Sequence, residues 1–167
     1  MQVDAALPFP ELPGLAGRRI VPACAEHIRH DAARRIFSWW SALALDHQPR
    51  RADFDIVDHA AVARHLFLIE RIDDGFELRL GGEEYTRIIP RKRGTQWRKE
   101  ASDPVIRDYA IFIDFVARSR RPYLGTGRLD LGEKYWRNFE SLTCPLAGDA
   151  THKESFLGCI SEIPDAD

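Results

Sequence analysis

The stretch Arg87–Lys99, RIIPRKRGTQWRK, holds six arginines and lysines among its thirteen residues. Arginine binds a phosphate or a carboxylate through two parallel hydrogen bonds, so the stretch is a candidate site for a small anion. The side chains that would make this site are Arg91, Lys92, Arg93 and Arg98. A basic run that contains a tryptophan is also typical of a nucleic-acid contact. The third interpretation is a solvated loop without a ligand, which we favour when the stretch is considered by itself.

Nucleic acid is the least favoured of these three interpretations. The chain of 167 residues has a formal charge of -2 and an isoelectric point near 6.3. A domain built to hold polyanions is usually basic overall. A nucleic-acid contact would therefore depend on residues 87–99 alone, and we expect no nucleic-acid partner.

The segment CAEHIRHD offers residue types that bind zinc. It places Cys24, His27 and Asp31 on one helical stripe, with His30 about one turn from His27. A helical zinc site carries a further ligand at a characteristic spacing, and no such ligand follows. We therefore expect exposed histidines near the start of a helix, and no metal site.

The sequence contains none of the common catalytic motifs. The GxSxG of a serine hydrolase, the HExxH of a metalloprotease and the GxGxxG of a dinucleotide-binding loop are all absent. Cys144 and Cys159 fall in predicted strands, where we interpret them as small packed residues. We therefore expect no catalytic residue and no enzymatic activity, and the sequence indicates no particular cofactor.

The composition is that of a soluble globular protein, with 44% hydrophobic and 30% charged residues. No apolar run reaches the roughly 20 residues needed to span a bilayer. The N-terminus lacks the basic and apolar regions of a secretory signal. Three cysteines without CxxC spacing do not predict disulfides. These features predict a cytoplasmic protein without a membrane partner.

The first half of the chain predicts helices followed by a hairpin. Residues 1–22 are rich in proline and glycine, and we expect a loose lead-in. Apolar residues then recur at helical spacing, which predicts one long amphipathic helix over residues 23–48, ended by Pro49. Asp55 can cap a short helix that runs to about Arg64. The runs HLFLIERID and FELRLGG flank an Asp-Gly turn, which predicts a β-hairpin.

The second half predicts a further helix and a strand meander. A short helix, EEYTRII, precedes the basic stretch. Ser102 or Asp103 then caps a helix in which apolar residues from Val105 to Val116 share one face. Three more apolar runs predict three strands ending near residue 163. The expected fold is α+β, a five-stranded antiparallel sheet with helices on one face, preceded by the long N-terminal helix. A small ligand would bind between sheet and helices.

This order of elements resembles that of a PAS domain, and local segments resemble a family of short bacterial PAS-like proteins. In that family a helix rich in tryptophan and leucine leads to a Pro-Arg-x-x-Asp-Phe-Asp segment, here PRRADFDIVD at residues 49–58. A strand that ends in Arg-x-x-Gly corresponds to Arg79 and Gly82, and later segments correspond to FESLTCPLAGD and ESFLGCIS. Glu83 departs from the threonine that is frequent after this glycine. The resemblance covers about residues 35–162 and predicts a PAS-like domain over residues 49–163.

The resemblance implies a stand-alone sensory or interaction domain that binds a small molecule and signals to a separate protein. The ligand itself is not named. The basic stretch would lie at the mouth of the pocket, which shifts our preference to a small anion or no ligand there. The residues that we expect to line the ligand site are Phe67, Arg79, Tyr85, Arg91, Arg93, Tyr109, Phe112, Arg128 and Phe139.

The Trp39-Trp40 pair makes the predicted N-terminal helix too apolar to be solvated on all sides. This helix either packs on the outer face of the sheet or meets its copy in a second chain. PAS-like domains often dimerise through such a helix, so we expect a homodimer. The contacts would be Ile28, Ile36, Trp39, Trp40 and Leu43.

Two alternative functions remain open. The first is an enzyme or carrier that acts on an anionic metabolite in the same cavity, held by the basic loop and Arg79. A buried Asp–His or Glu–Tyr pair in the cavity would support this alternative. The second is nucleic-acid binding through residues 87–99.

Overall fold

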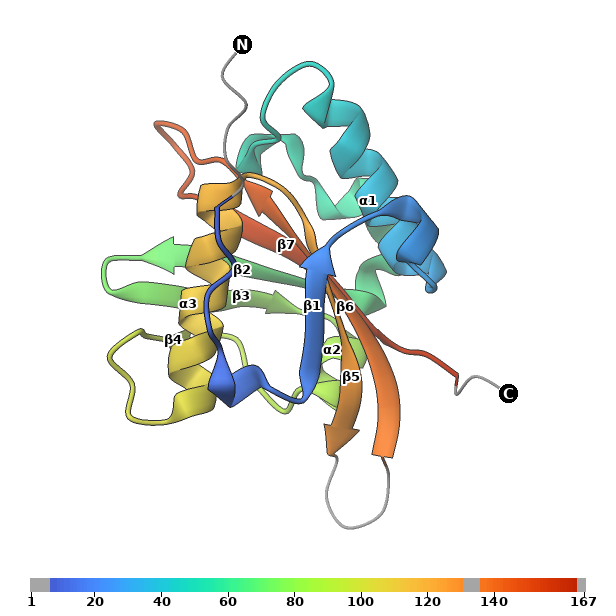
Figure 1. Ribbon diagram of the computed structural model, residues 1–167. Helices are drawn as coiled ribbons and strands as arrows, with labels where there is room; N and C mark the ends of the chain where they lie inside the picture. The colour runs from blue at the N-terminus through green and yellow to red at the C-terminus, as the bar shows by residue number, and fades with distance from the viewer. Residues whose placement is uncertain (1–6, 131–135, 165–167) are drawn as a thin grey trace.

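The computed structural model describes residues 7–130 and 136–164. Within these ranges the chain forms one antiparallel sheet of seven strands in the order β1-β5-β6-β7-β2-β3-β4 (Figure 1). The strands are β1 (Arg18–Pro22), β2 (Leu66–Ile72), β3 (Gly75–Gly81), β4 (Gln96–Trp97), β5 (Tyr123–Asp130), β6 (Trp136–Leu146) and β7 (Ser155–Glu162). The predicted hairpin β2–β3 and the predicted meander β5–β6–β7 are confirmed. The expected sheet of five strands is extended by β1 at one edge and β4 at the other.

The sheet is covered on both faces, so the expectation of helices on one face only is wrong. Side chains of the central strand β7 alternate between two clusters, with Phe156 and Ile160 in one and Leu157 and Cys159 in the other. Helix α3 (Pro104–Ser119) packs on the first cluster, here called the inner core. Helix α1, described below, packs on the second, here called the outer core.

The predicted long N-terminal helix is shorter than expected, because α1 spans only Asp31–Ala44. His30 precedes it in an extended conformation, and its Nδ1 accepts a hydrogen bond from the backbone N–H of Ala32 at 3.1 Å. The buried carboxylate of Glu140 accepts hydrogen bonds from the backbone N–H groups of Arg29 and His30 at 2.9 and 3.0 Å. These bonds hold the chain extended where the apolar spacing predicted further helical turns.

The apolar face of α1 covers the chain's own sheet. Three of the expected dimer contacts lie in the outer core: Ile28, Ile36 and Trp40. The indole N–H of Trp40 donates to the carbonyl of Pro145 at 2.8 Å. Trp39 and Leu43 are half-buried and leave less apolar surface for a second chain than expected. A homodimer stays a prediction.

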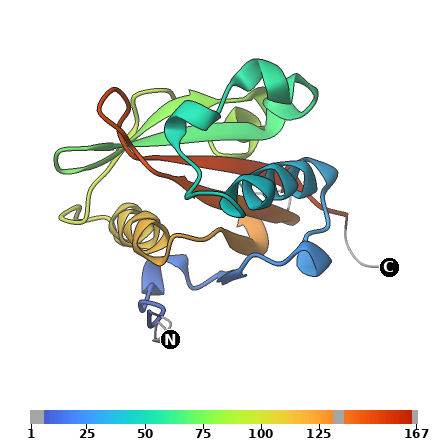
Figure 2. The same ribbon diagram turned by 90° about the horizontal axis from the view of Figure 1, so that it is seen from above.

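Residues 7–22 are docked on the domain, although the composition predicted a loose lead-in over residues 1–22, of which 1–6 lie outside the described ranges. Strand β1 pairs with β5, and the segment before it lies along α3 (Figure 2). The backbone N–H of Gly14 donates to the buried carboxylate of Asp108 on α3 at 2.7 Å. A Cβ at Gly14 would overlap the carbonyl of Pro104, so glycine permits this close approach.

Two further helical segments flank the hairpin. Helix α2 (Glu83–Ile88) follows β3 as predicted. The short helix expected after Asp55 is instead a 3-10 segment, Ile56–His65, and Asp55 caps it through the backbone N–H of Val57. Asp103 caps α3 as expected, by accepting a hydrogen bond from the backbone N–H of Val105 at 2.8 Å. In the described ranges, none of the helices is both long enough and apolar enough to cross a membrane.

The contact between Gly158 of β7 and Phe67 of β2 gives a test of the inner core. A Cβ at Gly158 would overlap the buried ring of Phe67. We expect Gly158→Ala to lower the free energy of unfolding by about 1–3 kcal/mol, the usual cost of overpacking a core. Urea denaturation followed by tryptophan fluorescence measures this change. Gly17→Ala is the control, because a Cβ there meets no atom within 4 Å. A Gly158→Ala protein as stable as the parent would contradict the packing.

Candidate functional site

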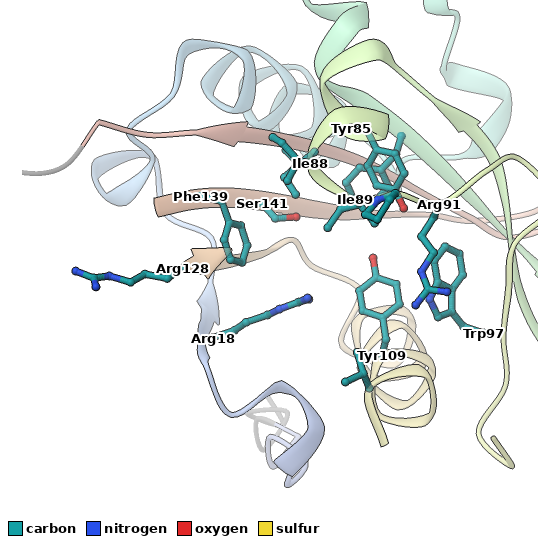
Figure 3. A pocket seen from close by; sticks show the side chains of 14 residues that line it. Arg18, Tyr85, Ile88, Ile89, Arg91, Trp97, Tyr109, Arg128, Phe139 and Ser141 are labelled. Carbon is teal, nitrogen blue, oxygen red and sulfur yellow. The ribbon is translucent and has the colours of Figure 1, made fainter. Parts of the chain in front are cut away.

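A cavity of about 550 Å³ lies between the inner face of the sheet, helix α2, the loop after α2, and helix α3 (Figure 3). Its apolar walls include Phe67, Ile88, Phe139 and Ile160. Its polar groups belong to Arg18, Tyr85, Arg91, Trp97, Tyr109 and Ser141. A mostly apolar cavity of this size with a few polar groups is typical of a small-molecule site.

Two arginines reach the cavity from separate elements, Arg18 from β1 and Arg91 from the loop after α2. Neither guanidinium has a carboxylate partner among the described residues. The Arg18 guanidinium lies 5.6 Å from the centre of the Phe139 ring, and it points toward Tyr109 (Figure 3). Arg128 also lines the cavity, but its side chain points away from it. The positive charge at the cavity is therefore carried by Arg18 and Arg91.

Hydroxyl groups of Tyr85, Tyr109 and Ser141 also line the cavity. Burial raises the pKa of Tyr85 well above its usual range, and the positive charges of Arg91 and Arg18 oppose this shift only in part. Burial also raises the pKa of Tyr109 to about 12. Both phenols therefore keep their protons near neutral pH and can donate hydrogen bonds to a ligand.

The described walls of the cavity contain no carboxylate and no imidazole. General acid–base catalysis near neutral pH usually depends on such a group. The Asp–His or Glu–Tyr pair that would support the enzyme alternative is thus missing from the described walls. Because their pKa values are raised, the two tyrosines stay protonated near neutral pH, and neither is available as a general base. The arrangement is suited to binding more than to proton transfer.

The structure brings most of the expected ligand residues together. Six of them line the cavity: Phe67, Tyr85, Arg91, Tyr109, Arg128 and Phe139. Phe112 lines a narrow second cavity of about 20 Å³, which shares Arg18 and Tyr109 with the first. Whether any of these residues binds a ligand stays a prediction.

Arg79 and Arg93 do not line the cavity, contrary to expectation. Arg79 sits at a bulge of β3, where its register with β2 shifts. Its guanidinium bonds to Glu70 at 2.9 Å and is also ion-paired with Glu77. Phe76 and Leu78 of β3 lie in the inner core, so alternation along the strand places Arg79 with Glu77 on the opposite face. Arg93 is exposed on the loop after α2.

The sequence analysis missed two important wall residues, Arg18 and Trp97. Arg18 is the first residue of the run RRIVP, which follows Gly17 and ends at Pro22. The β-prone pair Ile20-Val21 between these two residues is a short strand signal. Trp97 lies in β4, where it pairs with Phe76 of β3. A strand of two residues is too short to show any periodicity.

Half of the six cations in the basic stretch are paired with carboxylates of the same chain. Arg87 bonds to Glu84 at 2.6 Å and to Glu162 at 2.7 Å. The side chains of Arg98 and Lys99 bond to Asp74 and Asp114 at 3.1 and 3.0 Å, respectively. Arg91, Lys92 and Arg93 remain without a carboxylate partner among the described residues. The stretch is therefore no continuous basic stripe.

The helical stripe expected for Cys24, His27 and Asp31 does not form, because Cys24 and His27 precede α1. Within residues 7–130 and 136–164, histidine, cysteine and acidic side chains form no cluster that could hold a metal ion. The ring of His30 lies 4.8 Å from that of His65, with the two ring planes tilted.

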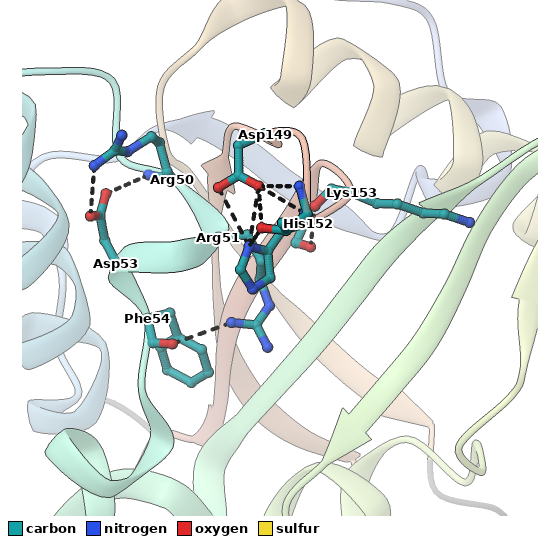
Figure 4. Close-up of polar contacts among 9 residues, drawn as sticks. Arg50, Arg51, Asp53, Phe54, Asp149, His152 and Lys153 are labelled. Carbon is teal, nitrogen blue, oxygen red and sulfur yellow. Dashed lines mark hydrogen bonds and ion pairs between the residues drawn. The ribbon is translucent and has the colours of Figure 1, made fainter.

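The segment PRRADFDIVD joins α1 to the loop between β6 and β7 (Figure 4). The carboxylate of Asp53 accepts a hydrogen bond from the backbone N–H of Arg50 at 2.8 Å. The backbone N–H of Arg51 donates to the carbonyl of Ala147, and that of Ala147 donates to the carbonyl of Pro49, both at 2.8 Å. These hydrogen bonds hold the loop after α1 against the loop between β6 and β7.

The two strand cysteines allow a direct test of the outer core. Burial raises the pKa of Cys144 well above its usual range and that of Cys159 to about 12. Only the thiolate reacts with alkylating reagents, so the two buried thiols should react slowly. Cys24 is only half-buried and is more accessible to the reagent. We expect iodoacetamide at mildly alkaline pH to label Cys24 alone in the folded protein and all three cysteines in urea, as measured by mass spectrometry. Rapid labelling of Cys144 or Cys159 before unfolding would contradict this packing.

A family model described as PAS domain matches residues 28–161. No curated protein matches the chain. The match includes the hairpin β2–β3, helices α2 and α3, and nearly all of the meander β5–β6–β7, which are the elements that enclose the cavity. It does not include β1 and therefore leaves Arg18 outside. The sheet order, the cavity and this match together show that the chain belongs to the PAS-domain family.

Proposed function

We propose that this PAS domain is a sensory module that binds a small organic anion in the cavity and signals to a separate protein. PAS domains are generally sensory rather than catalytic, and many mediate interactions. The observation that carries the proposal is the pair Arg18 and Arg91, which face a largely apolar cavity without carboxylate partners in the described chain.

The two arginines favour an anion because a partly desolvated cation without a counter-ion is costly. A carboxylate between them would gain charge-assisted hydrogen bonds from both guanidinium groups. Neutral Tyr85 and Tyr109 would add hydroxyl donors to the same negative group. A cation would be repelled by the same set of groups.

The rest of the cavity favours an apolar, planar ligand body. The rings of Phe67, Trp97 and Phe139 form much of its wall, and aromatic rings pack well against a flat ligand. We infer that the ligand is an aromatic or similarly planar carboxylate. The enzyme or carrier alternative would use the same anion, but the described walls supply no general base for a reaction.

Calorimetric titration of matched ligand pairs tests this proposal. The probes are benzoate, 2-naphthoate and indole-3-carboxylate, each compared with its neutral carboxamide. We expect at least one carboxylate to bind about tenfold or more tightly than its amide, because a hydrogen bond to a charged group contributes about 1.5–3 kcal/mol. Arg18→Gln and Arg91→Gln should each remove about that advantage.

Arg93→Gln is the matched control, since Arg93 lies on the same loop as Arg91 but outside the cavity. It should leave the affinity unchanged. Equal binding of carboxylate and amide, or an equal loss in Arg93→Gln, would contradict anion recognition by Arg18 and Arg91. Absence of binding by every probe would contradict a planar ligand.

A further inference from the structure

A second hollow lies on the outer face of the sheet, beyond the region that α1 covers. This hollow, here called the outer groove, has a volume of about 690 Å³. Its floor is formed by side chains that alternate with those of the inner face: Arg19 and Val21 on β1, and Leu124, Thr126 and Arg128 on β5. His27 and Arg29, from the segment before α1, form one wall.

The outer groove is positively charged. Arg19, Arg29 and Arg128 line it, and none of them has a carboxylate partner in the described part of the chain. The groove's described lining contains no aspartate or glutamate. The carboxylate of Glu140 lies close by, but it is 1% exposed and accepts the backbone N–H groups of Arg29 and His30.

This lack of partners contrasts with Arg71 on β2 and Arg87 on α2. Arg71 is bonded to both Asp114 and Glu154, and Arg87 is bonded to both Glu84 and Glu162. The outer groove therefore gathers positive charge that no carboxylate of the described residues balances. Its lining also includes the half-buried side chain of Val21, with Leu124 and Ile163 buried beneath the surface.

We propose that the outer groove is the docking surface for an acidic segment of a partner protein. The cations would pair with carboxylates of the segment, and the apolar floor would accept intervening aliphatic side chains. A protein segment fits better than a nucleic acid. The groove's described lining exposes no phenylalanine, tyrosine or tryptophan for base stacking, because Phe139 is buried, and the chain's formal charge is -2.

This inference names a partner for the proposed sensory function, but its test does not use the inner cavity. Either proposal can therefore fail without the other. The probe is a short fluorescein-labelled peptide of alternating glutamate and valine, with an otherwise identical lysine–valine peptide for comparison. Fluorescence anisotropy measures binding to the full chain.

We expect the glutamate peptide to bind and the lysine peptide not to bind. Affinity should fall about tenfold or more between about 50 mM and about 300 mM salt, because exposed ion pairs are screened. The double variant Arg19→Glu/Arg29→Glu should lose at least about tenfold in affinity at low salt. Lys92→Glu/Arg93→Glu makes the same change in net charge away from the groove and should bind like the parent.

Far-UV circular dichroism and thermal unfolding establish that both variants fold. If Arg19→Glu/Arg29→Glu does not fold, Arg19→Gln replaces it, and a loss of about threefold or more is expected. Failure of the glutamate peptide to bind would overturn the proposal, as would an equal loss in the two double variants. Tighter binding of a single-stranded oligothymidylate, lost in Arg19→Glu/Arg29→Glu, would assign the groove to nucleic acid instead.

Discussion

Burial of the central strand β7 on both faces is the constraint from which the rest of the architecture follows. Nearly every side chain of Ser155–Glu162 is buried. A strand buried on both faces needs a cover on each side of the sheet, and α3 and α1 supply those covers. Gly158 of β7 has no side chain, and the ring of Phe67 occupies the space that a Cβ would need. This close packing sets the position of the ring that forms part of the cavity wall.

The two covers are unequal in extent, and this difference leaves room for two hollows. Helix α3 and the N-terminal segment enclose the inner face only in part, so a cavity remains beside α2. Helix α1 covers the outer core but not the whole outer face of β1 and β5. Strand β1 borders both hollows, because adjacent residues of a strand point to opposite faces. Arg18 thus faces the cavity and Arg19 the groove, which gives one edge strand contact with both proposed partners.

Much of this fold could be predicted from the sequence where the signal was local. The Asp-Gly turn predicted the hairpin, and the cap at Asp103 predicted the start of α3. Within ESFLGCIS the residues FLGCI form a continuous apolar run, which is the pattern of a strand buried on both faces. Packing of the Trp39-Trp40 helix on the outer face of the sheet was one of the two arrangements that the sequence left open. The extended chain before α1 depends on Glu140, which is more than a hundred residues away in the sequence. No local pattern can reveal such a bond.

The candidate site could be predicted only in part, for the same reason. Phe67, Tyr85 and Tyr109 lie on regular elements whose apolar faces were visible in the sequence. Arg79 was expected at the ligand site, but it lies with Glu77 on the face opposite the inner-core residues Phe76 and Leu78. Arg18 was missed because it lies on a short edge strand within a proline-rich segment, outside the region that matches the family. The basic stretch was informative for Arg91, yet its total charge was misleading, because Arg87, Arg98 and Lys99 have carboxylate partners.

The central claim is that Arg18 and Arg91 together hold the negative group of a ligand. Arginine side-chain NMR tests it most directly, through the Nε–Hε signals of the ¹⁵N-labelled full chain with and without 2-naphthoate. The account predicts that the signals of Arg18 and Arg91 shift and exchange more slowly with solvent, while that of Arg93 is unchanged. A shift confined to Arg93, or an unchanged Arg18 signal at saturating ligand, would contradict it.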